Sequence, residues 1–545
     1  MNLIGNINAI PFRRFRGGGG VAPFPSIPGM IARYSALGLA NEEMSKNPVW
    51  VDKTGNGHDL QMKNFAWKGM SGVGGYVADI DEWGTNSTAA YFERNSIKIT
   101  ATFKENVSLG LLYHNIKLRQ SCVLKVTGIP EGCDAFLDDR LGNRFYMSED
   151  GVYEIIPSNF LAEALYLSIE KYPERWYGSK LTIEQLPLYP GALVFDGVDD
   201  YGVCDNFPIL TKEKGYTVVA LRQWITYNPN AISAIATNAS DRSFNGAFTF
   251  ENYNKGAEQT ISYGATQISL QYSKSPFSWQ TTSKYNGVNI ANGNKDATNS
   301  LVLGRSYPQR NEFANFAIWE LVFLDHDATE EELTKIKDYF VKTYPWLFPD
   351  QAWTVVGKTN EDEDRATIAN ITGNGNDLIL SNFGFAEGSG YNEQGEYAGY
   401  LVTDGVDDKI TSSIFEMGND WTIIGDWELI NTEKKDNAGI VKFNSIVIYN
   451  YNPILINIKN GRNNLIPDQN TVNAICSDGR IYSKDWKESI YNEETESTSK
   501  NFLTIGYSGN SYTKIAFKNL AIYPTVLSKE DCIKAYNYLQ TLKAK

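Results

Sequence analysis

The chain has 545 residues, of which 42% are hydrophobic and 13% aromatic, enough apolar side chain to pack the cores of several domains. Its 64 acidic residues outnumber its 50 lysines and arginines, so the formal net charge is −14. A surface of this sign repels phosphate, and we expect no nucleic acid partner. The sequence has no apolar run of about 18 residues, so we also expect no membrane span.

The first 21 residues are rich in arginine, phenylalanine and glycine. Phe12, Arg13, Arg14, Phe15 and Arg16 precede four consecutive glycines. Such a leader cannot build a core of its own, and a partner would have to hold it in place. We therefore expect an anchor, in which the phenylalanines fill apolar pockets and the arginines pair with carboxylates of another protein. The start has no apolar stretch typical of secretion, so we expect synthesis in the cytoplasm.

A long internal repeat follows the leader. The segment TGNGHDL at 54–60, with Asn64-Phe65 after it, recurs 318 positions later as TGNGNDL at 372–378, with Asn382-Phe383. The segment FDGVDD at 195–200 recurs as TDGVDD at 403–408, only 208 positions later. The change in offset indicates that about 110 residues are inserted into the first copy.

These offsets predict two related domains, one of them split, and an inserted module. Within the insertion, the segments 97–103 and 121–126 alternate between apolar and polar residues, as strands of a half-buried sheet do. We expect this module to be a small β-sandwich, because insertions are tolerated where loop ends lie close together. The predicted domains are an anchor (1–21), a split first sandwich (22–78 and 188–348), the inserted module (79–187) and a second sandwich (349–545).

The Asp-Gly-Val-Asp-Asp segments have two interpretations. Asp-Gly is a strong signal for a hairpin turn, because glycine accepts a positive φ. Clustered carboxylates are also the oxygen ligands that calcium prefers. We favour the turn, and expect no cofactor unless calcium binds, in which case the ligands would be Asp199, Asp200, Asp407 and Asp408.

The Gly-Asn-Gly loops lack the lysine and following helix of a phosphate-binding loop, so we expect tight turns in which Asn and Gly adopt left-handed conformations. His58 stands where the second copy has Asn376, which argues against a shared catalytic role. The other histidines, His114 and His326, form no recognisable nucleophile motif with a serine or cysteine.

Each copy ends in a strand followed by a helix. Leu303-Gly304 matches Ile505-Gly506, and the segment AIW at 317–319 matches AIY at 521–523. Thr329 and Ser528 then stand three residues before a carboxylate, which predicts a capped helix start. The apolar stripe of each helix needs a sheet to lie against. Its members are Leu333, Ile336 and Phe340 in the first helix, and Cys532, Ala535 and Leu539 in the second.

One carboxylate pair deserves a test as a glycosidase site. Asp426 and Glu428 flank Trp427 in an expected strand, so both would project from one face, about 6.5 Å apart. The first copy has Leu221 and Gln223 instead, and we favour a solvated face. We expect no enzymatic activity.

The five cysteines have no metal-like spacing, and only Cys122 and Cys133 are close enough in sequence to suggest a disulfide, which we do not favour.

The repeated loop, the Asp-Gly-Val-Asp-Asp hairpin and the late strand before a helix resemble the laminin-G-like, concanavalin A-like jelly-roll family. The resemblance covers about 430 residues, without the insertion and the leader. It implies an all-β fold of tandem sandwiches, the first with an inserted small β-sandwich, each ending in a short helix. It does not imply an activity.

In its arrangement, the chain resembles virion proteins of crAss-like phages that infect Bacteroides. This resemblance implies a head fibre, a capsid decoration or a tail-associated protein, which is made in the bacterial cytoplasm and resides in the virion. The implied partners are capsid or tail proteins at the N-terminus, further copies of the chain in a homo-oligomer, and host or gut glycans. The alternatives are a carbohydrate-binding adhesin outside a virion and, last in order, a glycosidase.

Overall fold

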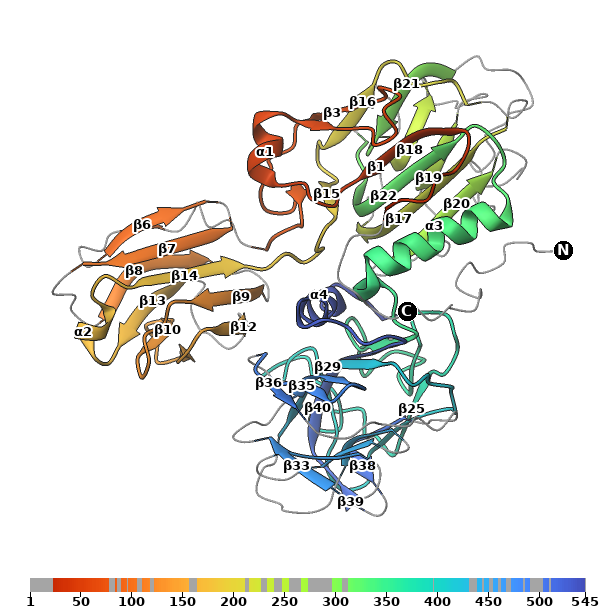
Figure 1. Cartoon of the computed structure of the whole chain (residues 1–545). Coiled ribbons are helices and arrows are strands. Elements are labelled where there is room, and N and C mark those ends of the chain that lie inside the picture. The colour runs from red at the N-terminus through yellow and green to blue at the C-terminus, as the bar shows by residue number, and fades with distance from the viewer. Residues whose placement is uncertain are drawn as a thin grey trace. The chain divides into compact units, whose positions relative to one another are not determined.

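The computed structural model shows an all-β protein built of three β-sandwiches, accompanied by a few short helices (Figure 1). It describes residues 23–544 except for the following segments: 78–83, 86–89, 96, 105–109, 118–121, 156–163, 211–214, 227–232, 240–247, 254–265, 273–296, 306–311, 396, 431–438, 444–445, 450–453, 459–461, 467–471, 484–485, 491–502 and 509–510.

The first sandwich has one sheet built around β22 (Asn315–Leu324), in which every residue after the first is buried. The strand order is β20-β17-β22-β15-β4, and β1 pairs antiparallel with β22 on the edge that β15 also uses. The other strands are β1 (Met30–Ser35), β4 (Gly72–Val73), β15 (Leu193–Asp196), β17 (Thr217–Thr226) and β20 (Gln267–Tyr272).

The facing sheet of this sandwich has the order β19-β18-β21-β16-β3-β2. Its strands are β2 (Val49–Trp50), β3 (Leu60–Lys63), β16 (Tyr201–Cys204), β18 (Ser233–Ala239), β19 (Thr249–Tyr253) and β21 (Ala297–Leu303). Large side chains from both sheets, among them Trp50, Trp224 and Phe323, fill the space between them. Alternating β-branched and aromatic residues thus bury one face of each sheet, as in other sandwiches.

The residues between the first sandwich's two segments form a module of two five-stranded sheets, ordered β11-β10-β13-β8-β5 and β12-β9-β14-β7-β6. The predicted strands 97–103 and 121–126 are observed as β7 (Lys98–Phe103) and β9 (Cys122–Thr127). The remaining strands are β5 (Gly84–Thr85), β6 (Ala90–Arg94), β8 (Gly110–Lys117), β10 (Asp134–Asp138), β11 (Arg144–Met147), β12 (Gly151–Ile155), β13 (Ala164–Glu170) and β14 (Lys180–Gln185).

The second sandwich repeats the strand order of the first. Its sheet β34-β29-β40-β27-β26, with β23 on β40, corresponds to β20-β17-β22-β15-β4 with β1 on β22. The strands of this sheet, with the added β35 and β36, are β23 (Gln351–Thr354), β26 (Gly390–Tyr391), β27 (Leu401–Val402), β29 (Thr422–Leu429), β34 (Val472–Cys476), β35 (Arg480–Ser483), β36 (Glu488–Ile490) and β40 (Ile515–Tyr523).

Its facing sheet has the order β24-β25-β28-β37-β30-β31-β32-β33, and Trp353, Trp427 and Phe517 belong to the core between the sheets. The strands are β24 (Thr367–Ile368), β25 (Leu378–Ser381), β28 (Lys409–Ser412), β30 (Gly439–Phe443), β31 (Ile446–Tyr449), β32 (Ile454–Ile458), β33 (Arg462–Ile466) and β37 (Leu503–Ile505), and a separate hairpin joins β38 (Tyr507–Ser508) to β39 (Ser511–Tyr512). The predicted tandem sandwiches are therefore confirmed.

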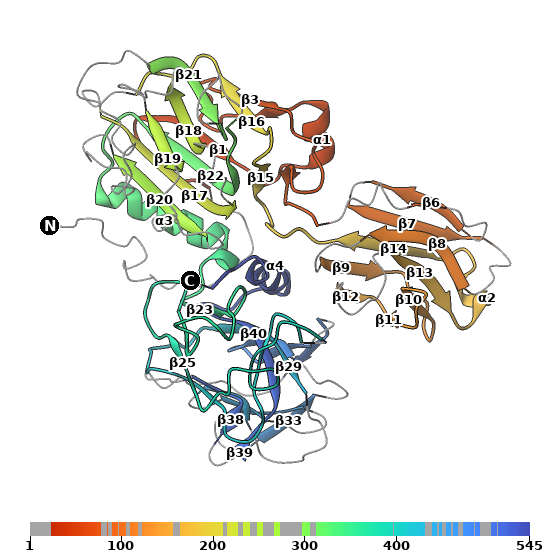
Figure 2. The ribbon, with the colours of Figure 1, turned by 180° about the vertical axis from the view of Figure 1, so that it is seen from behind.

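Helices follow the last strand of both sandwiches (Figure 2). In α3 (Glu330–Thr343), Thr329 and Glu332 form the complete reciprocal capping box. In α4 (Lys529–Leu539), Ser528 accepts a hydrogen bond from the Asp531 amide, but the reciprocal bond to the backbone is not formed. The other helices are α1 (Asn41–Lys46), α2 (Pro173–Trp176) and the 3₁₀ turn η5 (Pro345–Leu347).

The pairing of the last strands corrects one match made from the sequence. Thr217 of β17 lies opposite Leu324, and Thr422 of β29 lies opposite Tyr523, so Leu324 and Tyr523 are equivalent. Ala317 therefore corresponds to Ala516, and its match with Ala521 was wrong by five positions. The similar Ala-Ile-aromatic segments are a coincidence of strand composition.

By the density of internal contacts, the chain divides into two units. One contains Gly20–Tyr76 and Pro187–Tyr344, and the other contains Val77–Leu186 and Pro345–Lys545. All five cysteines are free and buried, so the Cys122–Cys133 disulfide is absent. Within the described ranges, no helix is long and apolar enough to cross a membrane.

Candidate functional site

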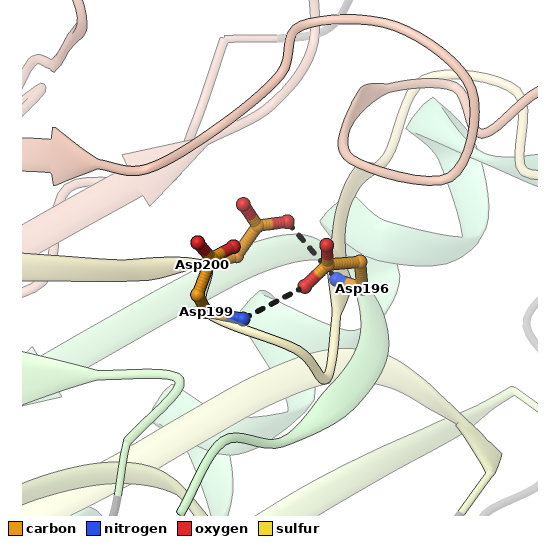
Figure 3. A group of neighbouring side chains, drawn as sticks. All are labelled: Asp196, Asp199 and Asp200. Atoms are coloured by element: carbon orange, nitrogen blue, oxygen red, sulfur yellow. Dashed lines mark hydrogen bonds between the residues drawn. The ribbon is translucent and has the colours of Figure 1, made fainter. Parts of the chain in front are cut away.

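The Asp-Gly-Val-Asp-Asp hairpin of the first sandwich is closed by its own carboxylates (Figure 3). Asp196 Oδ1 accepts the backbone N–H of Val198 at 2.8 Å and that of Asp199 at 3.3 Å. Asp200 Oδ2 accepts the Asp196 N–H at 3.0 Å. Gly197 adopts φ +75°, which a side chain would disfavour. The segment is a turn between β15 and β16, as we favoured.

Distant residues fix this hairpin to the rest of its sandwich. The Ser71 hydroxyl donates to Asp200 Oδ1 at 2.9 Å, and the Asn64 side-chain amide donates to the Asp199 carbonyl at 3.1 Å. Asn315 donates to the Asp196 carbonyl at 2.9 Å. One polar network therefore links the hairpin to β22 and to the loop between β3 and β4, which contains Asn64 and Ser71.

The second sandwich repeats the network. Asp404 Oδ1 accepts the N–H of Val406 at 2.7 Å, and Asp408 Oδ2 accepts that of Asp404 at 2.7 Å. Ser389 donates to Asp408 Oδ1 at 3.1 Å, and the Asn382 amide donates to the Asp407 carbonyl at 3.0 Å. Each of these contacts has a counterpart in the first hairpin, so they belong to the shared scaffold. The bond from Asn315 is particular to the first hairpin, because Lys514 occupies the equivalent place in the second.

The inner carboxyl of each hairpin has an altered acidity. Burial, and to a lesser extent the neighbouring Asp196 carboxylate, raise the pKa of Asp200 to about 8. Burial likewise raises the pKa of Asp408 to about 6, with hydrogen bonds from the Asp404 amide and Ser389 opposing the rise. Asp200 and Asp408 are both almost inaccessible to solvent, with 0% and 1% of their surface exposed.

Each hairpin gathers three carboxylates whose oxygens lie within 4.8 Å of one another, Asp196, Asp199 and Asp200 in one and Asp404, Asp407 and Asp408 in the other. Calcium takes six to eight oxygens. In the first hairpin, three of the six carboxylate oxygens already accept hydrogen bonds. This donor set does not fit a calcium cage, and it is explained by closure of the turn. Calcium binding itself stays untested.

The Gly-Asn-Gly loops are tight turns, as expected, but only their glycines, and not their central asparagines, adopt the left-handed conformation. The four glycines, Gly55, Gly57, Gly373 and Gly375, have φ between +73° and +83°. Asn56 and Asn374 are not left-handed, and instead their amides donate to carbonyls at the first strand of each sandwich. His58 packs edge-on against Phe207, and its backbone N–H donates to Asp52 Oδ2 at 3.4 Å. Neither contact involves an aspartate of the hairpins.

Asp426 is not on a solvated face, contrary to our expectation. Its side chain is nearly inaccessible, and it accepts hydrogen bonds from the Tyr400 hydroxyl and the Gln540 amide, each at 3.1 Å. Lys518 Nζ lies 3.5 Å from the same carboxylate. Tyr400 before β27, Lys518 of β40 and Gln540 after α4 therefore surround Asp426, and Glu428 is not part of this set.

The remaining candidates from the sequence are His326 and the anchor residues. His326 lies beside Asp325 and Glu332 at the start of α3, where these carboxylates raise the pKa of the imidazole against the opposing effect of burial. The anchor residues Phe12, Arg13, Arg14, Phe15 and Arg16 lie outside the described residues.

Sequence reasoning missed the serines and asparagines that bind the hairpins. Asn64 and Asn382 were noticed only as part of a repeat, yet both are left-handed, with φ of +65° and +69°. Ser71 and Ser389 keep the same offset of 318 as the loop before them. Extending the repeat comparison past the Asn-Phe pair would have found both serines.

No protein-family model and no curated protein matches the chain. Among solved structures, it is similar to a Trypanosoma rangeli sialidase in complex with the inhibitor DANA, with 9% identity and a TM-score of 0.26. That match covers 42% of this chain and 41% of the sialidase. The receptor-binding domain of botulinum neurotoxin type G matches with 13% identity and a TM-score of 0.22, over 34% of this chain and half of that domain.

These structures correct one expectation. Several of the similar chains are sialidases, so the expectation that the protein is not an enzyme is contradicted and is not carried further. At TM-scores of 0.25–0.26 and identities of 7–9%, the same similarity assigns no activity to any residue of this chain.

Proposed function

We propose that this chain is a structural and adhesive component of a bacteriophage particle, anchored by its N-terminal residues and displaying its sandwiches outward. The proposal rests on the observation that the two sandwiches are built on the same scaffold. They have the same strand order and the same hairpin network. The buried Asp426 cluster occurs in one sandwich only, since Leu221 occupies its place in the other. A duplicated rigid scaffold suits a protein that displays its sandwiches on the outside of a particle.

The inserted module supports the same role, because it consists of two sheets around a core of its own. A complete sandwich placed in a surface loop adds an exposed surface without disturbing the core of its host. In this proposal, the chain is made in the bacterial cytoplasm and joins capsid or tail proteins through Phe12, Arg13, Arg14, Phe15 and Arg16.

A specific surface of the module favours glycan binding as part of this role. Tyr172 and Tyr177 flank α2 with 48% and 40% of their surface exposed. Lys171 and Tyr172 both have positive φ, at +60° and +45°, a conformation that is costly for such side chains and is common at binding sites. The Arg175 guanidinium lies over the Tyr172 ring, 4.5 Å from its centre.

These residues offer what a sugar ring requires. The face of an aromatic ring packs against the C–H groups of a sugar's apolar face, and arginine and lysine donate hydrogen bonds to its hydroxyls. Figure 1 shows α2 at the end of the module away from the point where β14 ends. This end is therefore the surface we assign to glycans.

Removal of the first 21 residues tests the anchor. The truncated chain should fold, because the described sandwiches begin after this segment, but it should not be incorporated into particles assembled with it in place of the full chain. Particles would be purified by density gradient and probed with an antibody against the second sandwich. Incorporation at the level of the full chain would overturn the anchor.

A glycan array with the full chain tests the adhesive surface. We expect binding to bacterial polysaccharides that is lost in Tyr172→Ala and kept in Tyr91→Ala, a matched change because Tyr91 is an exposed tyrosine of the same module. Equal binding by both variants would overturn the assignment to the α2 surface, and no binding by the parent chain across a broad panel would overturn the glycan role. Neither result would bear on the anchor.

A further inference from the structure

The strands β11, β10 and β13 of the inserted module have an outer face that carries aromatic and charged side chains. Ala135 and Leu137 of β10 belong to the core of the module. Because side chains alternate along a strand, Phe136 and Asp138 point to the opposite, outer side. Tyr146 of β11 lies opposite Phe136 and therefore shares this side.

The middle of the outer face is an arginine that three groups hold in place. Arg144 Nε donates to Asp138 Oδ2 at 2.8 Å, and Nη1 donates to the Tyr146 hydroxyl at 3.4 Å. The guanidinium carbon lies 4.8 Å from the centre of the Phe136 ring. Phe136 is buried, whereas about half of Arg144 and of Tyr146 is exposed, at 45% and 44%. A fixed guanidinium and an open tyrosine ring thus stand side by side.

Further cations stand at both ends of β10. After its last residue, Arg140 lies with its guanidinium carbon 3.7 Å from the centre of the Tyr166 ring, and Tyr166 pairs with Asp138. At the other end, Lys171 forms an ion pair with Asp134, the first residue of the strand. The strand rises about 13 Å between these ends. The face therefore continues from the surface at α2, next to Lys171, along the whole length of β10.

The backbone is strained at the same two ends. Among the described residues of the module, those other than glycine with a left-handed backbone are Arg140, Lys171 and Tyr172, with φ of +57°, +60° and +45°. Left-handed Asn64 and Asn382 recur in the two sandwiches and belong to their shared scaffold. The strained residues of the module belong to no such repeat, and strain of this kind is common where a ligand is held.

We propose that this outer face binds the interior of an uncharged polysaccharide chain, which runs from the surface at α2 along β10. The inference rests on the glycan role proposed above and extends it from one end of the module to a sheet face. Aromatic rings pack against the C–H groups of sugars, and held cations donate to their hydroxyls. The face is longer than one sugar ring, so several consecutive sugars contact it.

The charges of the face indicate the class of ligand. Arg144 is compensated by Asp138 and Lys171 by Asp134, and Glu170, which pairs with Asp134 across the strands, adds another carboxylate. A compensated surface does not attract phosphate or uronate groups over long distances. Protein interfaces have few charged residues at their centre, where this face has an ion pair. A neutral chain rich in hydroxyls fits these features.

Native gels that contain a soluble polysaccharide test the proposal on the full chain. The neutral panel is mannan, laminarin, xyloglucan and dextran, and polygalacturonate is the acidic comparison. At least one neutral polysaccharide should retard the chain. Tyr146→Ala should weaken this binding by about tenfold or more, and Tyr146→Phe, which keeps the ring, should retain it. Tyr91→Ala is the matched control, because Tyr91 is exposed on β6 of the other sheet.

Oligosaccharides cut from the retarding polysaccharide separate this face from the surface at α2. The parent chain should bind a hexasaccharide about tenfold or more tightly than a disaccharide, and Tyr146→Ala should abolish this difference. Tyr172→Ala should weaken the binding of both. Equal affinity for the two lengths, or unchanged hexasaccharide binding in Tyr146→Ala, would overturn the extended face and leave the surface at α2 intact.

Three other results would also overturn the proposal. Retardation by polygalacturonate alone would show that the ligand is acidic. No retardation in any gel would remove this face together with the glycan role. A parent chain that is not retarded and sediments as a dimer, which Tyr146→Ala dissociates, would show that the face is a contact between copies of the chain.

Discussion

Asp200 and Asp408 are both buried, and they perform the same task in the two sandwiches. Each accepts a backbone N–H across its hairpin and a serine hydroxyl from a distant loop. A buried carboxyl that is fully hydrogen-bonded stabilises a unique turn, and the same burial disfavours its charge. The hairpins should therefore be sensitive both to loss of a partner and to pH.

The first prediction concerns pH. The pKa of Asp200 rises in the folded state from an ordinary 3.8 to about 8, so the folded form binds this proton more tightly than the unfolded form. The stabilisation is complete below about pH 4 and is lost as the pH rises through about 8. The corresponding loss for Asp408 should end near pH 6. Hydrogen exchange of β15 and β27, read separately, would follow the two sandwiches.

Asp200→Asn is the matched control, because the amide is neutral at every pH and its oxygen can still accept one hydrogen bond. The pH dependence of β15 should flatten in this variant, while that of β27 is unchanged. A stability of β15 that increases between pH 4 and 8 would show that the sign is wrong.

The second prediction concerns the serines. Ser71→Ala and Ser389→Ala should each destabilise their own sandwich by about 1–3 kcal/mol, because a buried carboxylate oxygen loses its donor. Asp199→Ala should cost less, since this side chain is exposed. Denaturant melts of the full chain would measure these values. A similar loss for the exposed and the buried residue would argue that the network is not what stabilises the hairpin.

At the scale of single residues, the sequence predicted the hairpin turns and their aspartates, but not the serines that donate hydrogen bonds to them. The Asp-Gly signal is local, and it was sufficient for the hairpins. Ser71 lies 129 positions before Asp200, with the whole inserted module between them. No local pattern links residues so far apart, and only comparison of the copies could have done so.

Among the elements, the two terminal helices show how a shared signal is used to different extents. Both begin at a hydroxyl residue followed by a carboxylate, but of the two only α3 has the reciprocal bond, in which the Thr329 N–H donates to the Glu332 carboxylate. A complete box satisfies two orphan amides, where a single cap satisfies one. The sequence could identify the starts, and it could not distinguish the two geometries.

The third prediction follows from this difference. Thr329→Ala should destabilise α3 by about 1 kcal/mol, and Glu332→Ala should remove the other half of the box with a similar effect. Ser528→Ala should weaken α4, while Asp531→Ala should have a smaller effect than Glu332→Ala because Asp531 makes no bond to the Ser528 amide. Exchange rates of the first-turn amides would measure all four. Equal effects of the two acidic changes would contradict it.

The last strands show where pattern matching fails for a physical reason. Residues in β22 and β40 are almost all buried, so their sequences are mostly apolar on both faces and carry no clear period. Both strands also contain a bulge opposite β17 and β29. Without alternation to fix the register, a three-residue similarity was enough to shift the match by five positions.

For the whole molecule, repeats were the most informative signal. They predicted tandem sandwiches and an insertion, and the strand orders confirm the fold. Activity could not be read in the same way, because what a sandwich binds depends on a few loop residues. The anchor, the glycan surface at α2 and the particle role are proposals that rest on arrangement and exposure.

The fourth prediction belongs to this scale and concerns calcium. Because the hairpin oxygens are largely used by amides and hydroxyls, calcium and a chelator should leave the melting temperature of the full chain unchanged within about 1 °C. A calcium-dependent rise that disappears in Asp407→Ala would show that the ion binds and would add it to the hairpin.

The particle role is tested most directly by locating the chain on intact virions. Particles banded from a lysate of the source phage would be incubated with a gold-labelled antibody against the inserted module and imaged by electron microscopy. The account predicts gold at a defined position on the outer surface of the head or tail of most particles. Unlabelled particles, with the chain recovered only in the soluble fraction of the lysate, would contradict it.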